Sequence, residues 1–298
     1  MTPKRFKTDI GVGPTNEFSL RVSVATLVRV IFENPGSSDW MLALERKATL
    51  LFAPAAVSTQ RGLRRDPSDV LRKHFVDVKA QPFGGAIQIH DLRMLQDHIG
   101  DFHFDSRKSR SEQDFRLFIQ PAAWNTVQQF CLQHFIQDDL ILEADPRREL
   151  AEEFADLLQI HLRAEQYTYQ PVGTIIEDLP SPTENTYARG SLTARIYRIF
   201  EARIVDSSLR DALMANSEGC SDHDLQKRAL QNSQNGGPGW ANAALTLPLK
   251  QIITGYLAIS PQARNQPTSF QTHQLDETVA AVLENVTVPK YRRLLTEH

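Results

Sequence analysis

Four acidic residues recur at helical spacing in the middle of the chain, where their carboxylates could bind a metal ion. Asp145 and Pro146 supply an N-cap and a first-turn proline, which predicts a helix over residues 145–158. At about 100° per residue, the apolar residues of this helix fall on one side and its carboxylates on the other. Carboxylates three and four residues apart repel one another, so their clustering favours a bound cation such as Mg²⁺, which prefers oxygen ligands. The acidic residues are Glu149, Glu152, Glu153 and Asp156.

The same pattern has an ordinary structural explanation. An acidic face opposite an apolar stripe is typical of a helix that packs on one side and meets water on the other. Lysines and arginines elsewhere could compensate the charge. The metal site and the solvated helix therefore both stay open at this point. If the helix is only solvated, the chain could be a protein that binds partners.

Composition narrows the class of protein. The chain has 298 residues, of which 41% are hydrophobic and 23% charged, and this is enough apolar material for a core. The 33 Lys and Arg against 36 Asp and Glu give a net charge of −3, so we expect no nucleic-acid partner. Cys131 and Cys220 lie far apart and fit a reducing cytoplasm. With no apolar run of membrane-spanning length, we expect a soluble, cytoplasmic protein without membrane contact.

Strand and helix patterns alternate along the chain, which predicts an α/β or α+β fold. Strands follow from β-branched runs and helices from apolar residues at helical spacing. The C-terminal part reads as weak helical segments and a final helix. Strands are predicted at 20–32, 40–44, 115–119, 167–176 and 193–204, helices at 121–135, 145–158 and 275–286, and loops at 53–80, 90–112 and 179–190.

Three other groups of residues could bind ligands, but each has a plainer explanation. A run of histidines and aspartates resembles metal-dependent phosphohydrolases of the His-Asp type, yet its spacing matches no ligand pattern and we expect a solvated insertion. A basic cluster at 107–110 reads as a solvated loop, and the glycine-rich stretch 236–239 as a hinge. The histidines and aspartates are His90, Asp91, Asp97, His98, Asp101, His103 and Asp105, and the basic residues are Arg107, Lys108 and Arg110.

The run Arg148-Glu149-Leu150-Ala151-Glu152-Glu153 is similar to the second half of the Nudix box, the signature of hydrolases that cleave nucleoside diphosphates linked to another moiety. Phe83-Gly84-Gly85 resembles the Pro-Gly-Gly that precedes the box. Residues 27–32 and 41–46, which end at Arg46, resemble the early strands of the family. Residues 194–204 resemble a later core strand. The resemblance covers about residues 20 to 205, in the order the family has them.

The sequence departs from the family in the first half of the box. The position of its first glutamate falls on Leu140, that of its leading glycine on His134, and that of its late glycine on Ala155. About sixty residues separate Gly85 from Arg148, so a large loop insertion is required. Glu143, Glu177 or Glu201 could replace the missing acid. We therefore expect a Nudix-like α/β/α sandwich over 18–215 with an insertion at about 90–144, and a partly helical C-terminal extension over 216–298.

The resemblance implies hydrolysis of a nucleotide pyrophosphate derivative, with water attacking a phosphorus atom. Glu149, Glu152 and Glu153 would bind Mg²⁺ or Mn²⁺, and Arg148 would orient one of these carboxylates. Gly84, Gly85 and Arg46 would lie at the substrate. Because the first half of the box is absent, a catalytically inactive module that binds a nucleotide and regulates a partner is the alternative. Homo-oligomerisation and the identity of the nucleotide stay open.

Overall fold

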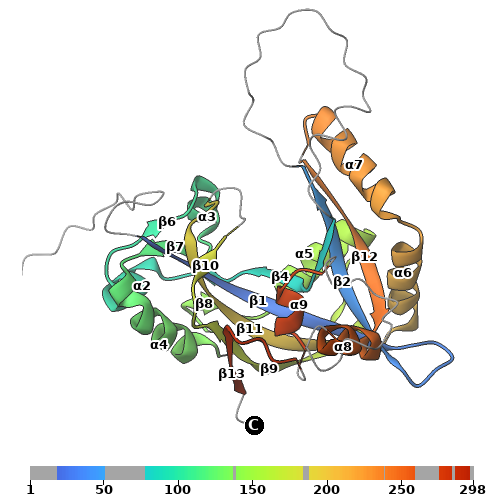
Figure 1. Cartoon of the computed structure of the whole chain (residues 1–298), viewed down its shortest axis with the longest axis horizontal. Helices are drawn as coiled ribbons and strands as arrows, with labels where there is room; N and C mark the ends of the chain where they lie inside the picture. The colour runs from blue at the N-terminus through green and yellow to red at the C-terminus, as the bar shows by residue number, and fades with distance from the viewer. Residues whose placement is uncertain are drawn as a thin grey trace, which may run out of the picture.

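Strand β1 (Leu20–Glu33) is the central strand of a large mixed sheet (Figure 1). The structure is a computed structural model that describes residues 19–50, 78–136, 139–183, 188–237, 239–258, 275–283 and 286–295. On one edge, β1 pairs in parallel with β11 (Leu192–Ile204), from Arg21 opposite Thr193 to Ile31 opposite Arg203. The sheet continues through β9 (Tyr167–Glu177) to β13 (Tyr291–Leu295). The fold is therefore mixed α/β.

The other edge of β1 pairs with three antiparallel strands in succession, each over about four residues. These are β7 (Arg116–Ile119), β4 (Phe83–Ala86) and β2 (Trp40–Thr49). After the first few residue pairs, β2 leaves β1 and pairs with β3 (Lys79–Gln81) and β12 (Trp240–Pro248). The segment β3–β4 therefore fills the fork between β1 and β2, with Pro82 at the bend.

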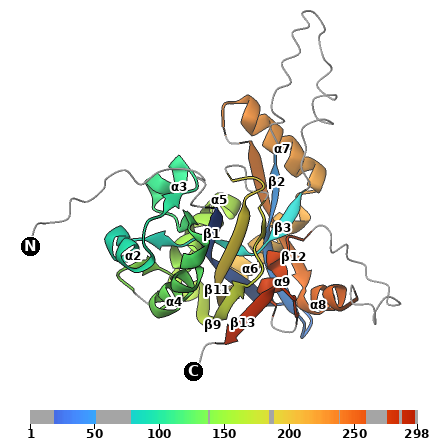
Figure 2. The same ribbon diagram turned by 60° about the vertical axis from the view of Figure 1, so that its left-hand side comes forward.

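Helices pack against both faces of the sheet, because side chains alternate between the faces along each strand. The even-numbered residues of β1, such as Val24 and Val30, contact helices α2, α4, α5 and α6 in two buried clusters. The odd-numbered Leu27 and Ile31 contact α8 and α9. Figure 2 shows the strands between α2, α3 and α4 on one side and α8 and α9 on the other.

The remaining strands are short. Strands β5 (Gln88–Ile89) and β8 (Leu142–Glu143) form a separate small sheet, and β6 (His103–Phe104) and β10 (Ser181–Pro182) join the large one. Among the described residues, no helix is both long and apolar enough to cross a lipid bilayer. The helices are α2 (Leu92–Ile99), α3 (Arg107–Glu112), α4 (Trp124–His134), α5 (Arg147–Leu158), α6 (Ser207–Glu218), α7 (Asp222–Gln234), α8 (Leu249–Ala258) and α9 (Thr278–Ala281), with single 3₁₀ turns at 121–123 and 164–166.

The strongly patterned elements were predicted correctly. Strands β1, β7, β9 and β11 and helices α4 and α5 lie where the sequence predicts them, within a few residues at the ends. Helix α5 begins at Arg147, one residue later than a cap at Asp145 implies, and the Asp145 carboxylate still accepts the Arg147 N–H at 2.8 Å. Cys131 is buried in the core, as its place on the apolar stripe indicates.

Two predictions were wrong. The expected loop at 90–112 contains α2, β6 and α3, because a few apolar residues such as Leu95 and Ile99 are buried although most of the segment is polar. The expected helix at 275–286 forms only the single turn α9. The predicted loop at 53–80 lies mostly outside the described residues.

The C-terminal part contributes strands to the same sheet. Strand β12, in a region read as weakly helical, pairs with β2 from Trp240 opposite Thr49 to Pro248 opposite Met41. Its alanines and leucines have little preference for a strand, so the pairing partner decides its conformation. Strand β13 pairs with β9. Strand β7, inside the expected insertion, pairs with β1. The C-terminal part and the expected insertion thus both contribute strands to the sheet around β1.

Gly84 is required by its backbone conformation and by the strand beside it. Its φ is +132°, and a Cβ there would overlap the carbonyl oxygen of Thr26. We predict that Gly84→Ala lowers the free energy of unfolding by about 2 kcal/mol or more. Gly36→Ala is the control, because Gly36 also has a positive φ, of +83°, but open space around it. Urea unfolding that gives equal losses for the two variants would contradict the steric explanation.

Candidate functional site

Helix α5 lies against the glycine strand β4, although about sixty residues separate them in the sequence. The Gly84 N–H donates a hydrogen bond to Glu153 Oε2 at 2.8 Å. The Glu149 carboxylate occupies the space where a Cβ on Gly85 would stand. Phe83 of β4 packs on Phe154 of α5 with ring centroids 5.1 Å apart, which fixes the helix on the strand. The structure therefore brings together the two segments that the sequence singled out.

The two α5 carboxylates belong to a longer group beside β4. Glu45 of β2 is 3% exposed and interacts electrostatically with Glu153. At the other end, Asp114 is 6% exposed and interacts with Glu149. We call Glu45, Glu153, Glu149 and Asp114 the acidic row. Sequence reasoning missed both of its ends.

The pKa values of Glu153, Glu149 and Asp114 show that their negative charge is poorly compensated. Burial, followed by repulsion from Glu45, raises the pKa of Glu153 well above its usual range. Burial also raises the pKa of Glu149, although the nearby Arg148 guanidinium opposes this. Burial raises the pKa of Asp114 to about 6, against the opposing charge of Arg116. Either protons or a cation would relieve these carboxylates.

Arg148 connects three carboxylates. Its Nε donates to Glu143 Oε2 at 2.8 Å, its Nη2 to Glu149 Oε1 at 2.6 Å and its Nη1 to Glu152 Oε2 at 3.1 Å. Burial lowers the pKa of Arg148, but the hydrogen bonds and charges of Glu143 and Glu149 outweigh this and raise it overall. Arg148 thus orients Glu149, as the resemblance implies.

Of the three acids left open as replacements, only Glu143 lies beside Arg148. Glu177 instead pairs with Arg195 at 2.7 Å and with Lys290 at 3.4 Å. Glu201 pairs with Arg29 and Arg203. Of the three, Glu143 is therefore the one that lies near the α5 carboxylates.

Three other predicted residues have different surroundings. The Glu152 side chain is 60% exposed. The alternative of an acidic helix face that only meets water therefore fits Glu152 better than it fits Glu149 or Glu153. Arg46 does not face α5: it donates to Asp222 Oδ1 at 3.0 Å and to the Cys220 carbonyl. Its neighbour Glu45 faces α5 instead, because successive strand residues point to opposite faces. That alternation, with Met41 and Ala43 on the same inward face, was the signal that could have identified Glu45.

The histidine and aspartate run does not gather into a site. Asp91 caps α2 by accepting the N–H groups of Arg93 and Met94, and Asp105 pairs with Arg21 at 2.7 Å. His98 contacts the Met94 carbonyl on the exposed side of α2. Asp91 and His98 therefore contact their own helix, and Asp105 ties Arg21 of β1 in place. The basic residues Arg107, Lys108 and Arg110 are exposed on α3, as a solvated surface requires.

The acidic row offers carboxylate oxygens that could bind a divalent metal ion. Within the described ranges, no three or more His, Cys, Asp or Glu side chains are arranged as a ready-made metal site. Glu149 and Glu153 nevertheless present oxygen atoms at two successive glycines, and Mg²⁺ prefers oxygen ligands and keeps several waters. The raised pKa values of these carboxylates come partly from mutual repulsion, which a divalent cation would relieve. The residues present fit such an ion.

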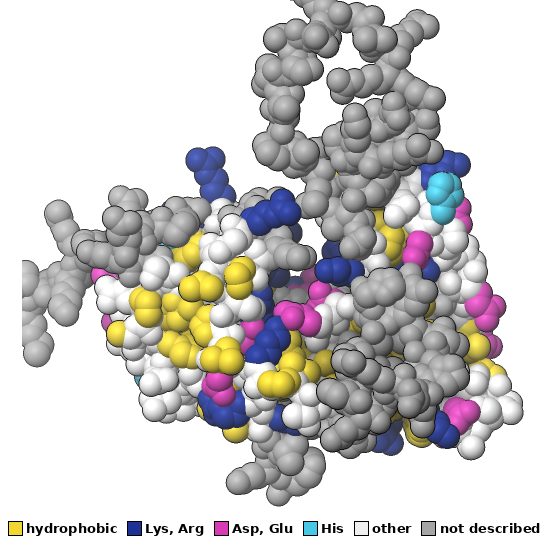
Figure 3. Space-filling model, viewed as in Figure 1, with side chains coloured by type: hydrophobic (Ala, Val, Ile, Leu, Met, Phe, Trp, Pro, Cys, Tyr) yellow, Lys and Arg dark blue, Asp and Glu magenta, His cyan; other side chains and the backbone are white. Residues whose placement is uncertain are grey.

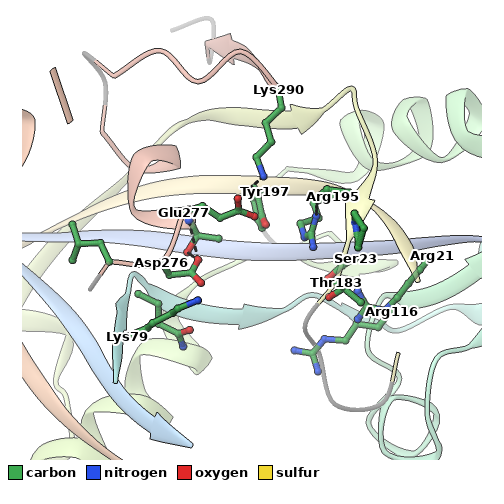
Figure 4. Close-up of a pocket in the computed structure, with 15 residues that line it drawn as sticks. Arg21, Ser23, Lys79, Arg116, Thr183, Arg195, Tyr197, Asp276, Glu277 and Lys290 are labelled. Carbon is green, nitrogen blue, oxygen red and sulfur yellow. Dashed lines mark hydrogen bonds and ion pairs between the residues drawn. The ribbon is translucent and has the colours of Figure 1, made fainter. Parts of the chain in front are cut away.

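A cavity of about 690 Å³ lies on the opposite face of β1, and two of its lining residues donate hydrogen bonds to the two ends of the acidic row. Gln81 lines it and donates to Glu45 Oε2 at 2.7 Å, and Arg116 lines it and donates to Asp114 Oδ2 at 3.0 Å. Figure 4 shows Arg21, Arg116 and Arg195 at one side and Lys79, Asp276, Glu277 and Lys290 at the other. In Figure 3, basic and acidic side chains meet at the centre of this face.

Carboxylates outside the cavity hold the three arginines in place. Asp105 binds Arg21 through Nε at 3.0 Å and Nη2 at 2.7 Å, and its side chain is only 1% exposed. Glu177, with no exposure, binds Arg195. Burial, and then repulsion from Arg116 and Arg195, lower the pKa of Arg21 although Asp105 opposes both. The three guanidinium groups are thus close enough to repel one another, an arrangement suited to binding an anion such as phosphate.

The pKa of Asp114 predicts a pH dependence. A carboxyl whose pKa is raised on folding stabilises the protein at low pH, and this contribution is lost as pH rises from about 4 through about 6. Relative to the wild type, Asp114→Asn should therefore gain up to about 3 kcal/mol of unfolding free energy between pH 4 and pH 7. Urea unfolding at both values, with a chelator present, measures this difference. A difference that does not vary with pH would contradict the raised pKa.

Comparisons with known proteins supply no further identification. No family model, no curated protein and no solved structure matches the chain. What points to a function is therefore local: glycines of β4 in contact with carboxylates of α5, and a basic cavity whose lining residues Gln81 and Arg116 donate hydrogen bonds to the ends of the acidic row.

Proposed function

We propose that the protein is a Mg²⁺- or Mn²⁺-dependent hydrolase that cleaves the pyrophosphate bond of a nucleoside diphosphate linked to another moiety. The contact of Gly84 and Gly85 with Glu153 and Glu149 carries this proposal. A solvated acidic helix has no reason to place its carboxylates on a glycine strand about sixty residues away in the sequence. The order β2, β4, α5, β11 and the helices on both faces support a Nudix-like sandwich.

The metal would be bound by Glu149, Glu152 and Glu153, with Glu45 close to Glu153. When bound, the ion would neutralise phosphate oxygens and lower the pKa of a coordinated water. Arg148 holds Glu149 in one orientation through its 2.6 Å hydrogen bond.

The cavity would hold the substrate. Its volume of about 690 Å³ is within the range of sites for nucleotide-sized molecules. Arg21, Arg116 and Arg195 can donate hydrogen bonds to phosphate oxygens, and their buried carboxylate partners fix them before the substrate arrives. The hydrogen bonds of Gln81 to Glu45 and of Arg116 to Asp114 support a connection between the cavity and the acidic row.

A second candidate is a module that binds a nucleotide without cleaving it. Arg148 already engages Glu143, Glu149 and Glu152, which lowers the net negative charge available to a metal. The position of the missing first glutamate is Leu140, which is 87% exposed. Tight nucleotide binding with no phosphate release in Mg²⁺ or Mn²⁺ would favour this candidate.

We predict that Glu149→Gln and Glu153→Gln each lower Mg²⁺-dependent turnover by about a hundredfold or more. Glutamine keeps the shape and, at 153, an acceptor for the Gly84 N–H, so thermal unfolding should change little. Glu152→Gln should also lower turnover. The assay measures phosphate released from ADP-ribose, UDP-glucose and NADH with a coupled phosphatase. Glu165→Gln is the control, because Glu165 is 68% exposed. Wild-type turnover in the 149 and 153 variants would remove the site assignment.

We predict that Arg116→Gln raises KM by about tenfold and leaves kcat nearly unchanged, since a hydrogen bond between charged groups contributes about 1.5 kcal/mol. The variant should fold, because the raised pKa of Asp114 allows this carboxyl to take up a proton when its partner is lost. Arg107→Gln, in an exposed position on α3, is the control. If both variants keep the wild-type KM, the substrate does not bind in the cavity.

A further inference from the structure

Arg198 of β11 lacks the acidic partner that other arginines of the same strand have. Arg195 pairs with Glu177 at 2.7 Å and Arg203 pairs with Glu201 at 2.6 Å. Arg198 makes one hydrogen bond, from Nη1 to Thr174 Oγ1 at 3.3 Å, and lies over the Phe200 ring at 5.6 Å from its centroid. Its Nε is buried and has no hydrogen-bond acceptor. Within the described chain, no carboxylate compensates this charge.

Arg198 faces a small pocket with mostly apolar walls. The pocket has a volume of about 250 Å³, and its walls include Phe135, Ile136, Tyr169 and Phe200. It lies on the α4 and α5 face of the sheet, opposite the basic cavity, because Arg198 and Phe200 point away from Arg195 and Tyr197.

A β-bulge contributes to the shape of this pocket. The register of β9 against β11 shifts between Ile199 and Phe200, where Pro171 and Gly173 are the successive partners. Pro171 has no N–H to donate to the ladder, so such a residue is tolerated at a bulge. The bulge leaves Pro171 in the wall of the pocket beside Phe200. The apolar surface next to Arg198 is thus a built feature of the strand pair.

A charge in these surroundings is costly without a partner. Burial alone lowers the pKa of Arg198, and no neighbouring charge contributes. Asp145 also lines the pocket, but its carboxylate is taken by Arg147, at 2.9 and 3.0 Å, and by the Tyr169 hydroxyl at 3.2 Å. The pocket therefore offers hydrogen-bond donors and a positive charge at one point, and aromatic surface around it.

We propose that this pocket binds a small aromatic anion, a flat ring carrying one carboxylate or phosphate group. The anionic group accepts hydrogen bonds from the Arg198 guanidinium. The ring packs against Tyr169 and Phe200, whose centroids are 6.2 Å apart, and against Phe135. A volume of about 250 Å³ admits one or two fused rings and is too small for a whole nucleotide. This site does not depend on the hydrolase proposal.

Naphthoate and naphthyl phosphate are suitable probes, with naphthalenemethanol as the neutral analogue and acetate as the anion without a ring. We expect isothermal titration calorimetry to show the better aromatic anion binding at least about tenfold more tightly than the alcohol or acetate. The two anions distinguish a carboxylate site from a phosphate site. Equal affinity for the alcohol and both anions would overturn the proposal.

Arg198→Gln should abolish the preference for the anion, and Arg203→Gln, on the same strand, should keep it. Arg116→Gln should also keep it, which separates this pocket from the basic cavity. If Arg198 only stabilised the fold, Arg198→Met would lower the urea midpoint. We expect instead that the midpoint of Arg198→Met stays the same or rises, because the substitution removes an uncompensated charge. A lower midpoint for Arg198→Met, or unchanged anion binding by Arg198→Gln, would contradict the assignment.

Discussion

The close contact between β4 and α5 is the constraint on which the rest of the site depends. Gly85 has no side chain, and the Glu149 carboxylate fills the space a Cβ would take. Gly84, with a φ of +132°, turns its N–H toward Glu153 while its Cα lies against the Thr26 carbonyl. A side chain at Gly85 would separate the strand from the helix, and a side chain at Gly84 would push β4 away from β1. Two glycines therefore determine how near the carboxylates come to each other and to β1.

This contact explains why the acidic row is electrostatically strained. The carboxylates of Glu149 and Glu153 both lie against β4, and Glu45 of β2 repels Glu153. Arg148 compensates the outer side through Glu143, Glu149 and Glu152, whereas the Gly84 N–H and Lys47 stabilise the charge of Glu153. A site that keeps carboxylates with raised pKa values gives up stability, and such a loss is typical of functional sites rather than of packing alone.

Sequence patterns predicted the elements but only part of the site. Helix α5 and strand β11 carry regular apolar spacing, which any pattern argument detects. The contact of α5 with β4 depends on which strand pairs with residues 25–28 of β1, and no local pattern carries that information across about sixty residues. Glu45 was overlooked beside Arg46, although strand alternation separates their faces. Asp114 has no sequence signal, because burial by the surrounding chain creates its raised pKa.

Strand β11 contributes arginines to two pockets on opposite faces of the sheet. Its odd-numbered Arg195 lines the basic cavity with a buried carboxylate behind it, so its charge is met before any ligand binds. Its even-numbered Arg198 lines the aromatic pocket without such a partner. An arginine that is already paired can orient a highly charged ligand without strain in the free protein. An unpaired one gains most from a single anion, because that anion removes a desolvated charge. The difference in pairing therefore favours different ligands at the two sites.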